Sequence, residues 1–196
     1  MVIAGAAVQP VWAAFLVLLV LERLFELWLS GKNARAAFAR GAVEAGAPHF
    51  RTMKLVHTAF LFACPAEVIL LQRAFPGALG WAALGAAVLA QGLRYWAIGT
   101  LGSRWNVRII VLPEAQPVTG GPYRFVRHPN YVAVAVELCA VPLAHGAYLT
   151  AIAFTAANAL LLSVRIRAEE RALGAAYGKA FADRPRFVPR IGGTHG

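Results

Sequence analysis

The sequence is poor in charged residues. They make up 14% of the 196 residues, against about 25% in soluble domains, whereas hydrophobic residues make up 59%. This balance excludes an ordinary soluble domain and predicts a multi-pass integral membrane protein. The N-terminal region lacks the charged segment and the cleavage site of a signal peptide, so we expect the first apolar run to be a retained helix.

Cysteine is nearly absent. The two cysteines, Cys64 and Cys139, lie inside apolar segments and form no CxxC motif. This pattern favours small apolar core residues over a disulfide or a metal site. We therefore predict no metal centre.

Acidic residues are also scarce. The chain has 9 Asp and Glu against 19 Lys and Arg, which gives a formal net charge of +10. The basic residues lie between apolar segments, where topology signals and lipid-headgroup contacts occur, and no nucleic-acid-binding motif accompanies them. The charge therefore predicts contacts with membrane lipids and no nucleic-acid partner.

Apolar segments dominate what is present. A membrane-spanning helix needs about 20 apolar residues, and five candidates cover residues 10–29, 53–71, 78–101, 130–144 and 147–164. Only His145 and Gly146 separate the last two, which predicts a tight helical hairpin. The helical pattern continues to about residue 182, before Pro185 ends it. The predicted fold class is an all-α integral membrane protein with five transmembrane helices and a C-terminal helix that extends into the cytoplasm.

The distribution of Lys and Arg predicts the orientation. Four lie between the first two apolar segments, four between the third and fourth, and seven from Arg165 to Arg190, whereas Arg73 alone lies in the opposite loops. The positive-inside rule then places the N-terminus outside and the C-terminus in the cytoplasm. In a bacterium the membrane would be the inner one.

Two connecting segments carry weaker signals. Residues 32–46 are basic and amphipathic, which predicts a segment lying at the membrane interface. Residues 103–120 contain apolar side chains at alternate positions from Trp105 to Val111, which predicts that this segment is extended backbone across the cytoplasmic mouth of the bundle.

Two polar clusters flank the predicted hairpin. Residues 121–131 contain Arg127, His128 and Pro129, and residues 165–170 contain basic and acidic side chains. The hairpin would fold them against each other into one site. Pro129 suits a first helical turn, so the backbone N–H groups of residues 130–132 would be free to bind an anion. In the alternative interpretation, Arg127 reaches lipid phosphates and His128 only caps the helix.

Three charged residues inside apolar segments need an explanation. Glu137 lies within the fourth segment, where an ionised carboxylate costs about 2.5–3.5 kcal/mol on insertion scales, so it needs a partner or a proton. Its functional and structural interpretations remain open. Glu67 and Arg94 are similar, although Glu67 follows Pro65 closely, and in the alternative interpretation it only satisfies backbone groups at a kink.

Arg165 lies near the end of a span, four residues before Glu169 on the same helical face. Such a pair adds only about 0.2–0.5 kcal/mol of helix stability, so stability hardly explains it. A charge at that depth favours a functional interpretation.

Residues 118–189 resemble the isoprenylcysteine carboxyl methyltransferase family of integral membrane enzymes. The matching residues are Val118-Thr119-Gly120-Gly121-Pro122-Tyr123, Arg127-His128-Pro129-Asn130-Tyr131, Arg165, Glu169-Glu170, Leu173, Tyr177 and Pro185-Arg186-Phe187-Val188-Pro189. The resemblance implies one methyltransferase domain over residues 1–196, with three helices in 1–101 and the binding part in 102–196.

The resemblance also implies that S-adenosylmethionine binds between the last two helices. The implied cofactor-binding residues are Val118, Gly121, Tyr123, Arg127, His128, Pro129, Tyr131, Glu169 and Glu170. Arg165 matches the position that contacts the substrate carboxylate, on a prenylated or other lipophilic acceptor. For a phenol or enol acceptor, Glu137 or His128 would accept the proton.

Two alternatives remain open from the sequence. The Arg-His-Pro-x-Tyr motif of residues 127–131 also occurs in membrane sterol and steroid reductases, which implies an NADPH-dependent reductase as the second candidate. A membrane scaffold without enzymatic activity is the third. The acceptor and the oligomeric state stay undetermined.

Overall fold

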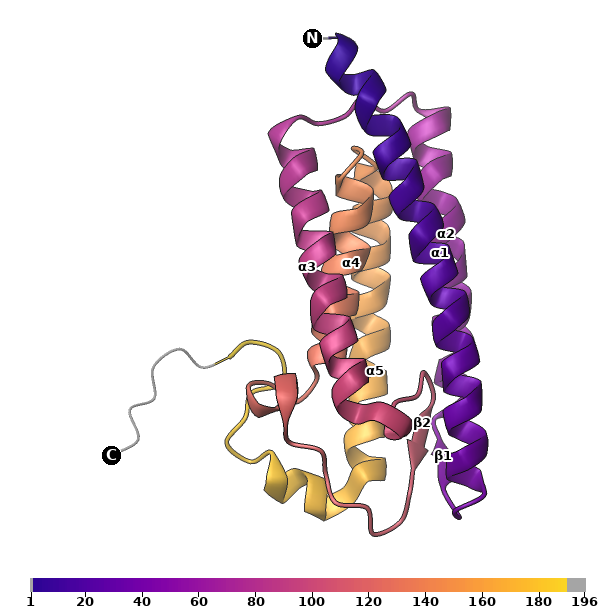
Figure 1. Ribbon diagram of the computed structural model, residues 1–196, viewed down its shortest axis with the longest axis vertical. Helices are drawn as coiled ribbons and strands as arrows, with labels where there is room; N and C mark the ends of the chain where they lie inside the picture. Colours follow the sequence, from indigo (N-terminus) through magenta and orange to yellow (C-terminus); the bar gives the residue numbers. More distant parts are fainter. Residues whose placement is uncertain (1, 190–196) are drawn as a thin grey trace, which may run out of the picture.

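The protein is a bundle of five helices in the computed structural model, which describes residues 2–189 (Figure 1). The helices are α1 (Val2–Phe38), α2 (Ala47–Leu70), α3 (Ala78–Leu101), α4 (Pro129–Leu143) and α5 (Tyr148–Ala180). Short strands β1 (Val43–Ala45) and β2 (Ile109–Val111) and 3₁₀ turns η1 (Gly102–Arg104) and η2 (Gly121–Arg124) lie between them. The predicted helical class is confirmed.

Two helices are long and apolar enough to cross a membrane by length and composition. They cover Phe50–Leu70 and Tyr148–Ala180, and α4 is a shorter apolar helix. The predicted number of five transmembrane helices and the sidedness of the termini stay predictions.

Helix α1 is longer than its apolar segment. It continues past residue 29 to Phe38, because residues 30–38 are mostly strong helix formers without proline. Residues 32–46 are therefore not one separate segment, and their place at the membrane interface stays a prediction. Their first half completes α1, and their end forms β1.

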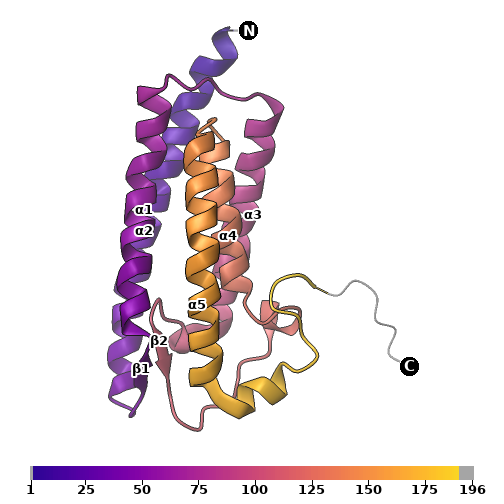
Figure 2. The same ribbon diagram turned by 180° about the vertical axis from the view of Figure 1, so that it is seen from behind.

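Strand β2 confirms part of the predicted extended segment. It pairs antiparallel with β1, with Val43 opposite Val111 and Ala45 opposite Ile109. The partner strand was not predicted, since three residues carry no measurable periodicity. The sheet ties the α1–α2 connection to the α3–α4 connection at one end of the bundle (Figure 2).

The polar segments gather at that end. The α1–α2 and α3–α4 connections and the C-terminal segment all lie there, whereas the α2–α3 and α4–α5 connections lie at the opposite end (Figures 1 and 2). The sequence-based expectation that these segments share one face of the bundle therefore agrees with the helix directions.

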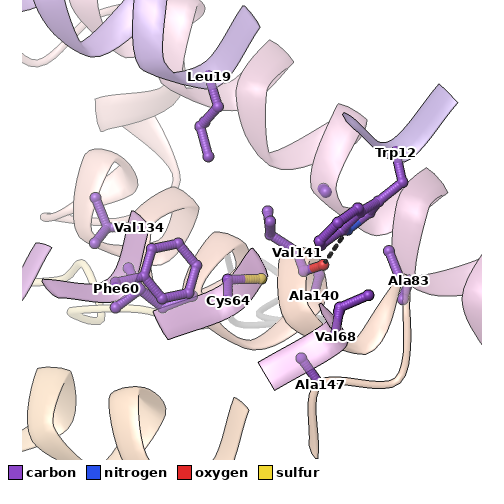
Figure 3. Close-up of a cluster of buried hydrophobic side chains, with 13 residues drawn as sticks. Trp12, Leu19, Phe60, Cys64, Val68, Ala83, Val134, Ala140, Val141 and Ala147 are labelled. Carbon is purple, nitrogen blue, oxygen red and sulfur yellow. Dashed lines mark hydrogen bonds between the residues drawn. The ribbon is translucent and has the colours of Figure 1, made fainter. Parts of the chain in front are cut away.

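A core of buried hydrophobic residues fills the opposite half of the bundle. Phe60 and Cys64 of α2, Leu19 of α1 and Val141 of α4 are buried together, and the Trp12 indole donates a hydrogen bond to the Val141 carbonyl at 3.3 Å (Figure 3). The prediction that Cys64 is a core residue is confirmed by its complete burial. Cys139 is only partly buried.

The α4–α5 hairpin is as tight as predicted. Gly146 adopts a φ of 72°, and an added Cβ would come within 3.0 Å of the Ala74 carbonyl oxygen. Glu67 of α2 holds the start of α5 by accepting hydrogen bonds from the backbone N–H groups of Leu149 (3.1 Å) and Thr150 (2.7 Å). Glu67 therefore satisfies backbone groups, although those of another helix and not of a kink at Pro65.

Helix α5 is not continuous. Gly174 has φ 71° and ψ −164°, which bends the helix after Leu173, so the predicted unbroken helix to residue 182 is wrong. Glycine adopts this conformation at no steric cost, and a single glycine in a helical pattern does not by itself predict it. The bend brings Tyr177 and Phe181 against Tyr123.

Candidate functional site

A cavity of about 880 Å³ lies within the bundle and reaches its polar end. All five helices and the α3–α4 connection contribute to its walls. Most of the sequence-predicted site residues line it: Val118, Tyr123, Arg127, His128, Tyr131, Glu137, Arg165 and Glu169. Gly121, Pro129 and Glu170 do not line it.

The two predicted polar clusters meet at this cavity. His128, just before α4, places its Nε2 3.1 Å from Glu170 Oε1 on α5. Arg186 of the C-terminal segment donates to both oxygens of Glu170, at 3.0 and 2.6 Å. The interpretation of His128 as a helix cap is wrong, because its side chain makes no capping hydrogen bond.

Tyr131 joins the clusters at a second point. Its hydroxyl donates to Glu169 Oε2 at 2.5 Å and accepts from Arg165 Nε at 2.8 Å. Arg165 is 5% exposed, and its Nη2 donates to the Val107 carbonyl at 2.6 Å. Its Nη1 is buried and has no hydrogen-bond partner among residues 2–189. This guanidinium therefore offers one free donor to an occupant of the cavity.

Arg127 binds the C-terminal segment. Its Nε donates to the Arg184 carbonyl at 2.6 Å, and its backbone N–H donates to the Pro185 carbonyl at 2.9 Å. The interpretation in which Arg127 reaches lipid phosphates is not supported, because these contacts engage it within the protein. Arg127 thereby holds the C-terminal segment beside His128.

Comparison with known proteins identifies the family to which the sequence is similar. The pattern of the isoprenylcysteine carboxyl methyltransferase (ICMT) family matches residues 82–175. A Bacillus subtilis protein named "Uncharacterized protein YpbQ" is 38% identical over 157 residues, which are 80% of this chain and 92% of that protein. A Haemophilus influenzae protein, also named only as uncharacterized, is 30% identical over 159 residues, or 81% of this chain and 92% of its own length.

The chain belongs to the isoprenylcysteine carboxyl methyltransferase family. It is therefore related to membrane methyltransferases, which generally use S-adenosylmethionine. The match includes α4 and most of α5, and so it contains Tyr131, Arg165 and Glu169.

Several features fit the adenosyl sulfonium that this family generally uses. The His128 and Tyr131 rings stack with centroids 5.3 Å apart, and aromatic faces attract cations. The Glu169 carboxylate lies beside them. Asn130 Oδ1 is buried without a hydrogen-bond partner in the described part of the chain, and Asn130 lines the cavity. It is thus an acceptor available to an amino or hydroxyl group.

Gly121 and Pro129 of the matching motif act on the backbone instead. Gly121 has a φ of 52°, and an added Cβ would lie 2.2 Å from Thr100 Oγ1, so η2 approaches α3 only with glycine there. Pro129 begins α4 and is fully buried. Neither contacts the cavity, and their assignment as cofactor-binding residues is replaced by a role in shaping its wall.

The expected anion site at the start of α4 is wrong. The N–H groups of Tyr131 and Val132 both donate to the His128 carbonyl, at 3.1 and 3.2 Å. These bonds tighten the first turn of α4. Of the three N–H groups of residues 130–132, that of Asn130 alone has no partner in the described part of the chain. Proline at the first position favours a helix start, but it does not exclude such a tight turn.

Glu137 lies in a buried cluster of charges. Its Oε2 is 3.4 Å from an Arg23 nitrogen of α1 and 4.0 Å from Arg94 Nη1 of α3. Arg94 in turn pairs with both oxygens of Glu26, at 2.5 and 2.7 Å. The sequence predicted that Glu137 and Arg94 need partners. Helix α1 supplies them, because Arg23 and Glu26 both lie on it.

Sequence reasoning missed these α1 residues and the α3–α4 connection. Arg23 and Glu26 line the cavity, although both lie in the first apolar segment, where charges are costly and therefore informative. Residues 103–117 line it as well. Their only sequence signal was the alternation after Trp105, which predicts an extended backbone and not a cavity wall.

Two groups near the polar end of the bundle, the Tyr123 phenol and the Arg186 guanidinium, have raised pKa values. Burial raises the pKa of the Tyr123 phenol well above its usual value, and the Glu169 carboxylate raises it further. Tyr123 therefore stays protonated. Hydrogen bonding to Glu170 raises the pKa of Arg186, which is protonated at physiological pH in any case.

Proposed function

We propose that the protein transfers the methyl group of S-adenosylmethionine to an oxygen of a lipophilic acceptor, either a carboxylate or a phenol or enol. The observation that carries this proposal is the buried Arg165 guanidinium, whose Nη1 amino group stays unpaired among the described residues in a cavity shared with Glu169 and the His128–Tyr131 ring pair. Membership of the family supports the reaction class.

We assign cofactor binding to the polar end of the cavity. Val118, Tyr123, His128, Tyr131 and Glu169 line it there and would hold the adenosyl and amino acid parts. When bound, S-adenosylmethionine supplies an electrophilic methyl group on a sulfonium. Glu169 balances positive charge, and Glu170 and Arg127 hold the C-terminal segment that covers this end.

Arg165 orients the acceptor oxygen. A guanidinium is permanently charged and binds carboxylates with defined geometry. An ionised carboxylate needs no base, and alignment of the two reactants supplies up to about 7–11 kcal/mol of the barrier reduction. A phenol or enol must lose a proton as its oxygen bonds the methyl group. Glu137 and His128 are then the candidate acceptors, because both line the cavity; Glu137 is paired with Arg23 and His128 with Glu170.

The side of the bundle offers a route for a hydrocarbon tail. Val20, Leu24 and Leu27 of α1 and Phe62 of α2 line the cavity and are also exposed to solvent. Residues that face both the cavity and the exterior mark an opening. An acceptor can therefore place its polar group at Arg165 while its tail stays in lipid.

Ligand binding in detergent tests the reaction class. We expect isothermal titration calorimetry to detect S-adenosylhomocysteine but not NADPH. Tight NADPH binding without S-adenosylhomocysteine binding would replace the proposal by the reductase function. Binding of neither compound would favour a scaffold.

Variants test the assigned residues. Labelled S-adenosylmethionine would be incubated with hexadecanoic acid, 3-pentadecylphenol or a farnesylated cysteine derivative. We expect Arg165→Ala and Glu169→Ala to lower methyl transfer by about 10²–10³-fold, the usual effect of losing one transition-state donor or charge. Arg167→Ala on the exposed face of α5 is the matched control and should retain activity. Unchanged methyl transfer by Arg165→Ala would contradict the role.

A further inference from the structure

The peptide group between Val107 and Arg108 is held at both ends. Its carbonyl oxygen accepts from Arg165 Nη2 at 2.6 Å, and its N–H, on Arg108, donates to Asn106 Oδ1 at 2.9 Å. The direction in which this carbonyl points therefore depends on Asn106. A guanidinium bound to that carbonyl takes its orientation from it.

Asn106 is itself held by α1. Its Oδ1 accepts from Ser30 Oγ at 2.7 Å, and its Nδ2 donates to the Ser30 carbonyl at 2.9 Å. Ser30 Oγ also accepts from the Val107 N–H at 3.2 Å. Ser30 is buried, so these hydrogen bonds form away from bulk water, where they are stronger and polarise one another.

We propose that Ser30 and Asn106 are positioning residues that orient the Arg165 guanidinium through the Val107 carbonyl. The inference rests on the proposed methyl transfer, in which the free Arg165 Nη1 must meet the acceptor oxygen. Nε is bound to Tyr131 and Nη2 to Val107, so these two bonds define the plane of the guanidinium and hence the direction of Nη1.

A neighbouring pair of hydrogen bonds, which also joins α1 to the α3–α4 connection, provides a structural comparison. Asn33, also buried on α1, donates to the carbonyls of Trp105 (2.8 Å) and Gly102 (3.2 Å). It fastens the same segment to the same helix, but it does not touch the peptide group that binds Arg165. Loss of Asn33 should therefore weaken the attachment without turning the guanidinium.

The test compares Ser30→Ala and Asn106→Ala with Asn33→Ala in detergent. We expect the first two to lower kcat for a methylated acceptor by about 10- to 100-fold, since small misplacements have effects of this size. Their affinity for S-adenosylhomocysteine should stay within about twofold of the wild type, because Arg165 is assigned to the acceptor. Asn33→Ala should lower the thermal midpoint by about as much as Ser30→Ala and Asn106→Ala do, but it should leave kcat nearly unchanged. Asn106→Asp keeps the Oδ acceptor but loses the Nδ2 donor to the Ser30 carbonyl, so it should lower kcat less than Asn106→Ala without reaching the wild-type value.

A spectroscopic readout needs no acceptor. The ¹⁵Nε resonance of Arg165, assigned by its loss in Arg165→Lys, should shift in Ser30→Ala and Asn106→Ala but not in Asn33→Ala. An unmoved resonance in the first two, or equal changes of kcat in all three alanine variants, would refute the positioning role. Failure of S-adenosylhomocysteine to bind would instead reject the proposed function, while the resonance would still report on the coupling.

Discussion

The individual residues of the matching motif have two different roles. His128, Tyr131 and Glu169 point chemical groups at the cavity, whereas Gly121 and Pro129 shape the backbone beside it. A linear motif cannot separate these roles, because the close approach of Gly121 to Thr100 exists only between η2 and α3. The distinction has a measurable consequence for stability.

Gly121→Ala should destabilise the protein more than Gly120→Ala. The left-handed conformation costs a non-glycine residue about 1–2 kcal/mol, and overlap with Thr100 adds to it, whereas Gly120 has an ordinary φ and no atom within 4 Å of an added Cβ. Thermal unfolding in detergent measures the difference. Adding Thr100→Ala to Gly121→Ala should recover the steric part only. Equal midpoints for the two single variants would contradict the proposed close approach.

Among the elements, α5 links the site to the C-terminal segment through its bend. Before Gly174 the helix presents Arg165 and Glu169, and after it the chain turns so that Tyr177 packs against Tyr123. A straight helix would carry Tyr177 away from η2. The bend thus completes the wall around the cofactor side of the cavity.

Gly174→Ala should therefore weaken cofactor binding. Alanine at this φ and ψ is strained by about 1–3 kcal/mol, which favours straightening of α5 and loss of the Tyr177–Tyr123 contact. We expect the affinity for S-adenosylhomocysteine to fall about tenfold, equivalent to 1.4 kcal/mol. Gly178→Ala lies in the same helix without positive φ or a close neighbour, so it serves as the control in the same titration. Equal affinities in both variants would exclude a role for the bend.

At the scale of the whole molecule, α1 completes the cavity through polar contacts. It is attached through Trp12 near one end, Glu26 in the middle and Ser30 near the other end. Between these points, Leu24 lines the cavity and is exposed to solvent. This arrangement leaves an opening toward lipid and predicts how tail length affects the reaction.

Leu24→Trp should obstruct that opening. Leu24 is 58% exposed and lines the cavity, whereas Val17 on the same helix is 59% exposed and does not. We expect Leu24→Trp to raise KM for a long-chain acceptor about tenfold, or 1.4 kcal/mol, and Val17→Trp to leave it unchanged. Wild-type activity should change little between tails of different length, because the tail leaves the protein. Strong selection for one length would instead require an enclosed tail site.

Much of the architecture was predictable because it depends on local composition. The apolar length of residues 78–101 predicted α3 to the residue, and the two residues between α4 and α5 predicted a tight turn. The convergence of residues 121–131 with residues 165–170 followed from that turn. Local patterns sufficed because a hairpin leaves few ways to arrange its two ends.

Other features were not predictable, since they depend on contacts between distant segments. Strand β1 exists because β2 lies beside it. The cap of α5 comes from Glu67 on α2, and the partner of Arg94 comes from Glu26 on α1. Buried polar groups need partners, but their sequence positions do not say which partner they find.

The sequence by itself determined the helical class, the hairpin and the set of polar residues that the family shares, because hydrophobic length and turn residues act locally. Only the tertiary structure decided which of those residues face the cavity, how α5 bends at Gly174, and that α1 supplies both the partner of Arg94 and the support of the Val107 carbonyl. The physical reason is that burial and hydrogen bonding between helices depend on three-dimensional distance, which a one-dimensional pattern does not contain.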